Sequence, residues 1–177
     1  LPANTPGIVV TQHMPEHFTR AFAERLNNIC AMEVCEAFDG QSVSNGKVVI
    51  ARGNLHMLLR RSDTEYYVKL RNGPTVNRHR PSVDVLFKSV AQAAGPDGIG
   101  IILTGMGNDG AAGMLEMKNS GAVNIAQDEA SSIVFGMPRE AITLGGVDHI
   151  VSLNRIPAKI LEIVERRNTV RQSYRYS

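Results

Sequence analysis

The sequence predicts a layered α/β domain with a mainly parallel sheet. Short apolar runs rich in β-branched residues alternate along the chain with stretches whose apolar residues recur at helical spacing, which is the pattern of strands followed by helices. The 177 residues suit one domain with a sizeable core. At the centre, the apolar run 101–103 breaks into a glycine-dense turn, and helix-compatible spacing returns over 111–118. This stretch predicts a strand-loop-helix joint.

The N-terminal half begins with a predicted strand over 7–11, whose apolar residues suit burial on both faces, as in a parallel sheet. The strand ends at Gln12-His13-Met14-Pro15, which places His13 just past its C-terminal end. A helix follows, because apolar residues then recur three or four positions apart: Phe18, Phe22, Leu26 and Ile29. The middle of the chain predicts a small antiparallel excursion, with strands over 33–39, 47–51 and 65–70.

The C-terminal half starts with a predicted helix over 83–94, with Ser82 as its N-cap and Gly95 just past its end. After the central joint, the remaining elements are expected in this order: a strand over 122–126, a short helix over 138–144, a strand over 149–151 and a closing helix over 156–164. The apolar rhythm then stops. We therefore expect residues 1–165 to form the domain and 166–177 a basic, frayed tail, with arginines at Arg166, Arg167, Arg171 and Arg175.

Composition restricts the functional classes. Lys and Arg number 19 against 17 Asp and Glu, a net charge of +2, so the overall charge does not favour binding to nucleic acid or to a membrane surface. The sequence has no apolar stretch of about 18 residues and no basic segment leading into an apolar one at its start. We therefore expect a soluble, unexported, cytoplasmic protein without membrane insertion. Cys30 and Cys35, the only cysteines, are too few for a disulfide scaffold or a structural zinc site.

The glycine-dense turn supports two interpretations. In the first, Gly105-x-Gly107-x-x-Gly110 is a dinucleotide-binding fingerprint, and Asp128 or Glu129 is the ribose ligand about 20 residues further on. In the second, Asp109 is the acidic member of a hydrolytic triad. His13 would be its partner, because the C-terminal ends of parallel strands meet at one edge of a sheet. A carboxylate there can orient a histidine that deprotonates a nucleophile.

Other histidines carry weaker signals. His13 and His17 have the spacing of some zinc ligands, but Pro15 opposes a regular helix between them and Glu16 is not placed as in H-E-x-x-H, so zinc is not favoured. The segment Arg78-His79-Arg80 suits either an acidic partner or substrate carboxylate, or a solvated bend. For His13, an ordinary strand-end histidine is the alternative to a catalytic base.

Four segments together resemble a known family: Thr11-Gln12-His13-Met14-Pro15, Asn77-Arg78-His79-Arg80-Pro81-Ser82-Val83-Asp84, Leu103-Thr104-Gly105-Met106-Gly107-Asn108-Asp109-Gly110 and Phe135-Gly136-Met137-Pro138-Arg139-Glu140-Ala141. They are similar to segments in the catalytic domain of the bacterial chemotaxis protein-glutamate methylesterases, the CheB type. The resemblance runs from about Gly7 to about Val164. Its T-G-M-G-x-D-G element is highly specific and displaces the dinucleotide interpretation.

The resemblance implies a Rossmann-like methylesterase domain with a three-layer, doubly wound, mainly parallel sheet. The implied activity is that of a serine hydrolase that removes methyl esters from glutamate side chains of chemoreceptors during chemotaxis adaptation, releases methanol and can deamidate receptor glutamines. No cofactor or metal is implied. The implied partners are the cytoplasmic domains of methylated chemoreceptors, and a receiver or methyltransferase domain in the parent protein.

By the same resemblance, His13 matches the histidine of the family's triad and Asp109 matches its aspartate. Met106 matches a position whose backbone N–H is associated with the oxyanion site. Five residues are therefore expected to hold the oxyanion or to position the substrate: Met106, Gly107, Arg78, His79 and Arg80.

One member of the family's triad lies outside this sequence. The family's nucleophilic serine stands in a G-x-S-T-G-G turn upstream of the segment that resembles 7–11. Ser82 is expected to be a helix cap, and Ser131-Ser132 lacks the glycine-rich strand-to-helix turn that exposes a nucleophile. We therefore expect an N-terminally incomplete catalytic domain without a preceding receiver domain. The alternative is a catalytically inactive module of the same fold, which binds a receptor or partner through the basic segment 78–80 and the basic tail.

Overall fold

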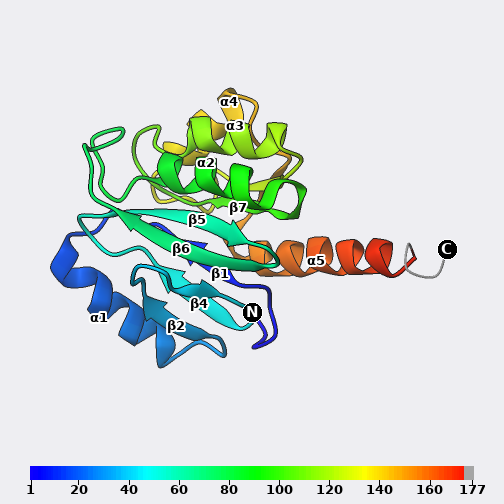
Figure 1. The fold of residues 1–177 in the computed structure, drawn as a ribbon. Helices are drawn as coiled ribbons and strands as arrows, with labels where there is room; N and C mark the ends of the chain where they lie inside the picture. Colours follow the sequence, from blue (N-terminus) through cyan, green and yellow to red (C-terminus); the bar gives the residue numbers. More distant parts are fainter. Residues whose placement is uncertain (174–177) are drawn as a thin grey trace.

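The structure, a computed structural model, describes residues 1–173 and the side chains of residues 1–170 (Figure 1). The helices are α1 (Glu16–Asn27), α2 (Val83–Ala94), α3 (Ala111–Asn119), α4 (Met137–Thr143) and α5 (Ile156–Ser173). The strands are β1 (Ile8–Val10), β2 (Glu33–Glu36), β3 (Ser42–Val43), β4 (Lys47–Ile50), β5 (His56–Ser62), β6 (Glu65–Arg71), β7 (Ile99–Ile102), β8 (Val123–Gln127) and β9 (His149–Val151). Strands and helices alternate over most of the chain, so the predicted α/β class is confirmed.

These strands form three small sheets. The sheets β1-β4-β2 and β7-β8-β9 are parallel, and the sheet β3-β6-β5 is antiparallel. The expected antiparallel excursion is wrong in two of its members, because β2 and β4 pair in parallel with each other and β4 also pairs in parallel with β1. The run Val48-Val49-Ile50 places apolar residues on both faces of β4, which suits a central parallel strand.

The sheet β7-β8-β9 is covered by helices on both faces. On one face, α5 packs Ile156, Ile160 and Ile163 against Ile125 of β8. On the other, Met114 and Met117 of α3 join the main core, together with residues of α2 and α4. Figure 1 shows α2, α3 and α4 grouped on the side of this sheet away from α5. The central joint therefore lies at the edge of a small parallel sheet that is covered by helices on both faces.

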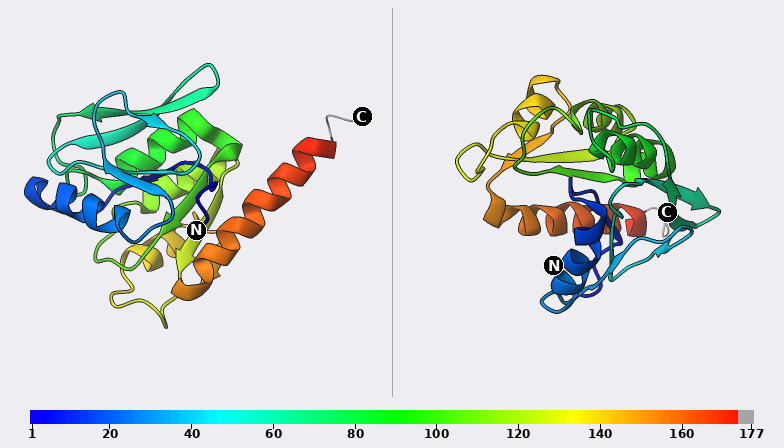
Figure 2. Two further views of the ribbon diagram at one scale, coloured as in Figure 1. Left: turned by 90° about the horizontal axis from the view of Figure 1, so that it is seen from below. Right: turned by 90° about the vertical axis from the view of Figure 1, so that its left-hand side faces the viewer.

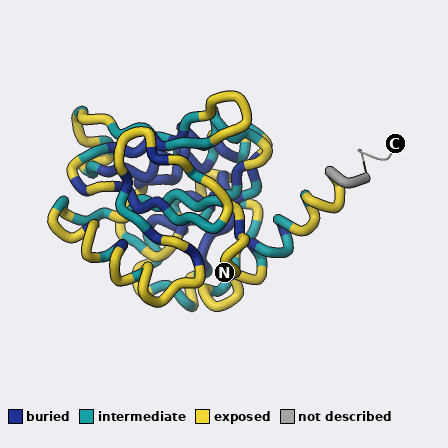
Figure 3. The backbone as a smooth tube through the Cα atoms, turned by 60° about the horizontal axis from the view of Figure 1, so that its bottom comes forward, coloured by how far each residue is buried: buried dark blue, intermediate teal, exposed yellow. Residues whose placement is uncertain are grey.

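The sheet β1-β4-β2 is also buried on both faces. Ala23 of α1 packs against Val34 and Ile50 on one face, and Val49 joins the main core on the other, where Met57 of β5 lies. The tube coloured by burial shows this buried interior surrounded by exposed loops (Figure 3). The predicted helix at Phe18 is confirmed, but Phe18 is 60% exposed. Thr19 and Ala23 are the buried residues of α1, and Phe22 and Leu26 pack partly buried beside them. Ile29 lies beyond the end of α1 and is 74% exposed.

Helix α5 continues past the end of its apolar stripe. Glu162 forms ion pairs with Lys159 at 2.6 Å and with Arg166 at 2.8 Å, a spacing that stabilises a helix. Arg167 also donates to the backbone carbonyls of Asp97 at 2.6 Å and Gly98 at 3.1 Å. The expected frayed tail is therefore wrong for 166–173, where the helix projects from the body (Figure 2). Arg175 and the side chain of Arg171 lie outside the described residues, and the domain boundary at 165 stays a prediction.

Within the described residues, no helix is long and apolar enough to cross a membrane.

The predicted strand-loop-helix joint is confirmed. Strand β7 ends at Ile102 and α3 begins at Ala111. Gly110 has φ +99°, and a Cβ there would lie 2.7 Å from Cγ1 of Val83, so this turn requires glycine. Asp109 precedes this glycine at the C-terminal end of one parallel sheet, and His13 follows β1 at the C-terminal end of the other.

Candidate active site

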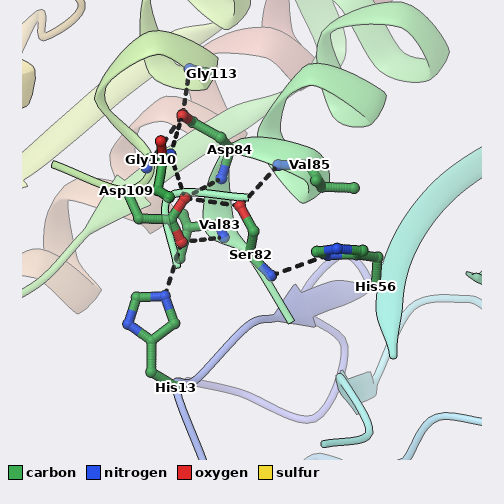
Figure 4. A network of polar contacts seen from close by, with 10 residues as sticks. His13, His56, Ser82, Val83, Asp84, Val85, Asp109, Gly110 and Gly113 are labelled. Carbon is green, nitrogen blue, oxygen red and sulfur yellow. Dashed lines mark hydrogen bonds and ion pairs between the residues drawn. The ribbon is translucent and has the colours of Figure 1, made fainter. Parts of the chain in front are cut away.

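The structure brings His13 and Asp109 together, as the sequence predicted. Nε2 of His13 lies 2.7 Å from Oδ2 of Asp109, across 96 positions of sequence (Figure 4). Asp109 is 1% exposed, whereas the side chain of His13 is 19% exposed. The carboxylate is thus shielded from water while the imidazole reaches the surface. This is the arrangement in which a carboxylate orients a base that other groups can reach.

Asp109 accepts five hydrogen bonds. Its Oδ2 accepts from His13 and from the backbone N–H of Val83 at 2.7 Å. Its Oδ1 accepts from Oγ of Ser82 at 2.7 Å, Nδ2 of Asn77 at 2.9 Å and the backbone N–H of Asp84 at 3.2 Å. Burial alone would raise the pKa of this carboxyl, but the hydrogen bonds from His13, Asn77, Ser82 and Val83 hold the pKa well below its usual range. Asp109 is therefore ionised at neutral pH.

Two carboxylates cap the N-termini of helices α2 and α3 reciprocally. Asp109, just before α3, accepts from the first two backbone N–H groups of α2. Asp84, in the first turn of α2, accepts from the N–H groups of Gly110 at 3.1 Å and Gly113 at 2.7 Å at the start of α3. Each helix start thus gains acceptors for its unpaired donors and a negative charge at the positive end of its dipole. Figure 4 shows this exchange between the two helices.

The imidazole of His13 is fixed by two contacts. Because ionised Asp109 can only accept, Nε2 of His13 carries the hydrogen in this contact, and Nδ1 is the nitrogen that has the lone pair in the neutral form of the ring. The ring of His79 stacks on that of His13, with centroids 3.6 Å apart and planes 8° apart. Burial and then the nearby His13 lower the pKa of His79, while Asp109 opposes them. A neutral His79 allows His13 to become charged without facing a second cation.

The basic segment 78–80 divides into three different environments. Only His79 contacts the His13–Asp109 pair. Arg80 donates to Oδ1 of Asn54, to Oδ1 of Asn72 at 3.0 Å and to the carbonyl of Gly73, so its guanidinium holds neighbouring loops together. Arg78 is exposed and has φ +69°. Contacts of Arg78, His79 and Arg80 with a substrate stay predictions.

The loop that carries Met106 and Gly107 is supported from the neighbouring loop. The carbonyl of Gly105 accepts from Gly136 at 3.1 Å and from Met137 at 2.7 Å, and the Gly105 N–H donates to Val134 at 3.0 Å. Met106 itself is 82% exposed. The segment 135–141 that contributed to the resemblance therefore holds the glycine-dense turn through the hydrogen bonds of Gly136 and Met137 to Gly105. The expected oxyanion role of Met106 and Gly107 stays a prediction.

The serines of this region have structural contacts. Ser82 is fully buried, and its Oγ accepts from the Val85 N–H at 3.4 Å, so the predicted N-cap is confirmed. Oγ of Ser131 donates to Asp128 at 2.6 Å and accepts from Leu153. Within residues 1–170, no serine hydroxyl hydrogen-bonds with His13.

Sequence reasoning missed three residues of this network. Asn77 and Asp84 contact Asp109 directly, and His56 accepts the Ser82 N–H at Nδ1 and donates through Nε2 to the Pro74 carbonyl. Asn77 and Asp84 stand at the two ends of the segment 77–84 that contributed to the family resemblance, but no local pattern assigned either of them a contact with Asp109. His56 lies in β5, where no sequence pattern marks its contact with Ser82.

Fold and site together define the class of this protein. It is an α/β domain in which a buried carboxylate orients a histidine at the C-terminal ends of parallel strands, as in hydrolases of the serine type. More particularly, the chain belongs to the CheB methylesterase family, whose sequence pattern matches residues 1–160.

Individual proteins support this assignment. A protein-glutamate methylesterase/protein-glutamine glutaminase of Hahella chejuensis is 60% identical over 163 residues, which are 92% of this chain and 44% of that protein. The protein of the same name from Yersinia pestis is 56% identical over 171 residues, 97% of this chain and 49% of that protein. The chain thus spans about half the length of the curated relatives it matches.

A solved structure gives the same result for the fold. The crystal structure of the Thermotoga maritima CheB methylesterase catalytic domain superimposes with a TM-score of 0.89 at 38% sequence identity, covering 92% of this chain and 87% of that one. The resemblance found in the sequence is therefore confirmed at the level of family and fold.

Proposed function

We propose that this protein hydrolyses γ-methyl esters of glutamate side chains, and deamidates particular glutamines, on bacterial chemoreceptors. The observation that carries the proposal is the His13–Asp109 hydrogen bond in a domain of the CheB methylesterase family. The relatives' names supply both reactions, since each is called a protein-glutamate methylesterase/protein-glutamine glutaminase. The proposed site of action is the cytoplasm, where the methylated domains of the receptors lie.

The proposed reaction uses His13, Asp109 and a nucleophilic serine that the family resemblance places ahead of residues 7–11. The serine hydroxyl attacks the ester carbonyl, and its proton passes to Nδ1 of His13, because Nε2 is already bound to Asp109. Asp109 stabilises the resulting imidazolium. The imidazolium then protonates the departing methoxide to give methanol, or the departing amine to give ammonia. Water, deprotonated by the same nitrogen, releases the glutamate and restores the serine.

The glycine-dense turn has the proposed role of stabilising charge on the substrate. Backbone N–H groups at Met106 and Gly107 would donate to the carbonyl oxygen as it becomes an oxyanion, an interaction that contributes about 3–4 kcal/mol per donor in other hydrolases. Arg78, His79 and Arg80 border the same edge of the fold and are proposed to position the receptor segment. The bracing of this loop by Gly136 and Met137 supports a fixed arrangement of donors.

The two parallel sheets meet at the candidate active site. The strands β1 and β7 lie in separate parallel sheets among the described residues, yet their C-terminal ends deliver His13 and Asp109 to one point. We propose that both belong to one doubly wound, three-layer sheet in the full-length protein. We further propose that a receiver or methyltransferase domain accompanies this one, because its relatives are about twice as long.

The test is methanol release from membranes that carry methylated receptors, using the full-length protein and its His13→Ala variant. We expect methanol from the parent protein and a loss of several orders of magnitude in the variant. The intact mass of the purified protein should exceed the 19.3 kDa of this chain. Receptor binding without methanol release would overturn the proposal and favour a binding module of the same fold.

A further inference from the structure

We propose that Asn77 and Asp84 are positioning residues: Asp84 anchors the side-chain amide of Asn77, and Asn77 fixes the Asp109 carboxylate in the plane in which it orients His13. This inference rests on the proposed hydrolytic function. It concerns residues that touch neither the substrate nor His13.

The side-chain amide of Asn77 bridges two carboxylates. Its Nδ2 donates to Oδ2 of Asp84 at 2.7 Å and to Oδ1 of Asp109 at 2.9 Å. A primary amide has two N–H bonds in fixed directions, so two acceptors determine the orientation of the group completely. Asn77 is at φ +50°, a conformation that asparagine tolerates better than most residues. Backbone conformation and side-chain chemistry therefore agree at this position.

Asp84 holds Asp109 from two directions. Its Oδ1 accepts from Gly110, the residue after Asp109, and from Gly113. Its Oδ2 accepts from the amide of Asn77, which also donates to the Asp109 carboxylate. Asp84 is 6% exposed, so water has little access to its carboxylate, whereas Asn77 itself is an exposed residue. The main chain and the carboxylate of Asp109 are thus both tied to one buried side chain.

Capping of α3 does not account for this arrangement. One oxygen of Asp84 makes both contacts to the start of α3, at Gly110 and Gly113. The second oxygen contributes nothing to that helix and is directed at Asn77. A displacement of about 1 Å in a reacting group can reduce the rate a hundredfold. A contact that fixes the Asp109 carboxylate, and through it the ring of His13, should therefore raise the rate of the proposed hydrolysis.

The first experiment uses Asn77→Gly, which removes the amide but suits the positive φ. We expect the pKa of Asp109 to rise, because one of its donors is lost, and kcat for methanol release by the full-length protein to fall about tenfold to a hundredfold with KM unchanged. The control is Asp63→Gly, which makes the same backbone change at φ +49° in the β5–β6 turn. An unchanged Asp109 titration, followed by carboxyl ¹³C NMR, would overturn the role of Asn77.

The second experiment tests whether Asp84 acts through Asn77. Asp84→Asn keeps an oxygen for Gly110 and Gly113 but turns an NH₂ group towards that of Asn77. The double variant combines Asn77→Gly with Asp84→Asn. If the two residues act as one unit, its kcat equals that of the less active single variant. If they act independently, the two fold-losses in kcat multiply. Multiplying losses overturn the link between Asp84 and Asn77. If the parent protein releases no methanol, the proposed function is overturned. The titration of Asp109 in Asn77→Gly then still tests whether Asn77 contacts and positions the Asp109 carboxylate.

Discussion

Replacing Asp109 with asparagine exchanges one of two acceptor oxygens for a donor, and the contacts of both oxygens are known. If the new NH₂ takes the place of Oδ2, it faces the Val83 N–H and Nε2 of His13. His13 must then carry its hydrogen on Nδ1, the nitrogen that has to accept a proton. If it takes the place of Oδ1, it faces the amide of Asn77 and the N–H of Asp84. Either orientation leaves a buried backbone donor without an acceptor.

These losses set the size of the effect. An unsatisfied buried donor costs about 1–3 kcal/mol, and the remaining contacts lose the strength of bonds to a charged group, so we expect Asp109→Asn to destabilise the fold by about 2–5 kcal/mol. For a chain of this size, each kcal/mol corresponds to about 2–4 °C in Tm, which gives a fall of about 4–20 °C. Methanol release should fall about 10⁴-fold, as when the aspartate of a serine protease triad is changed to asparagine.

The assay is thermal unfolding followed by circular dichroism, with methanol release measured on the same full-length variant below its Tm. Asp148→Asn is the matched control, because Asp148 also accepts from a backbone N–H, that of Asn124 at 2.8 Å, and pairs with Lys118, but lies at the surface. We expect the control to shift Tm by only a few degrees. If Asp109→Asn matched the control in Tm and retained the parent kcat, the assignment of Asp109 as the orienting carboxylate would be refuted.

Three further outcomes are expected. Gly113→Ala improves helix propensity by about 1 kcal/mol, but its Cβ would lie 2.7 Å from Cβ of Phe87 and 3.0 Å from the Asp84 carbonyl, so urea unfolding should show a net loss of about 1–3 kcal/mol; a gain would contradict the close packing of α2 and α3. Ser82→Ala removes the cap of α2 and a donor to Asp109 and should cost about 1–2 kcal/mol in the same assay. Because the pKa of Asp109 is lower in the folded than in the unfolded protein, its contribution is complete above about pH 4 and disappears as the pH falls below that value. Urea midpoints between pH 6 and pH 2 should therefore fall less steeply in Asp109→Asn than in the parent protein.

The sequence predicted that His13 and Asp109 would lie close together, and the family resemblance was needed to prefer a catalytic pair over an ordinary strand-end histidine. Both residues follow short apolar strands, and parallel strands bring their C-terminal ends together. Ser82 could be predicted as an N-cap because capping depends on residues within one helical turn. The structure confirms both contacts, the local cap of α2 and the hydrogen bond between His13 and Asp109 across 96 positions.

The pairing of strands and the network around Asp109 were not predictable in this way. Periodicity identifies a strand but not its neighbour, so β4 was grouped with the antiparallel strands although it lies between β1 and β2. Asp84 has the position of an ordinary acidic residue in a first helical turn, where a favourable interaction with the helix dipole is sufficient explanation. Its partners Gly110 and Gly113 are 26 and 29 positions away, beyond the reach of any local pattern.

The reciprocal caps couple the reacting group to local unfolding. Opening the first turn of α2 exposes Val83 and Asp84 and releases Asp109, while opening the first turn of α3 frees Gly110 and Gly113 and releases Asp84. The start of α2 holds the acceptor for α3, Asp84, and the residue before α3, Asp109, is the acceptor for α2, so opening one helix start weakens the other. The four amide hydrogens should therefore exchange with solvent in a single cooperative event. We therefore expect that the molecule can orient His13 only in the state in which both helix starts are intact.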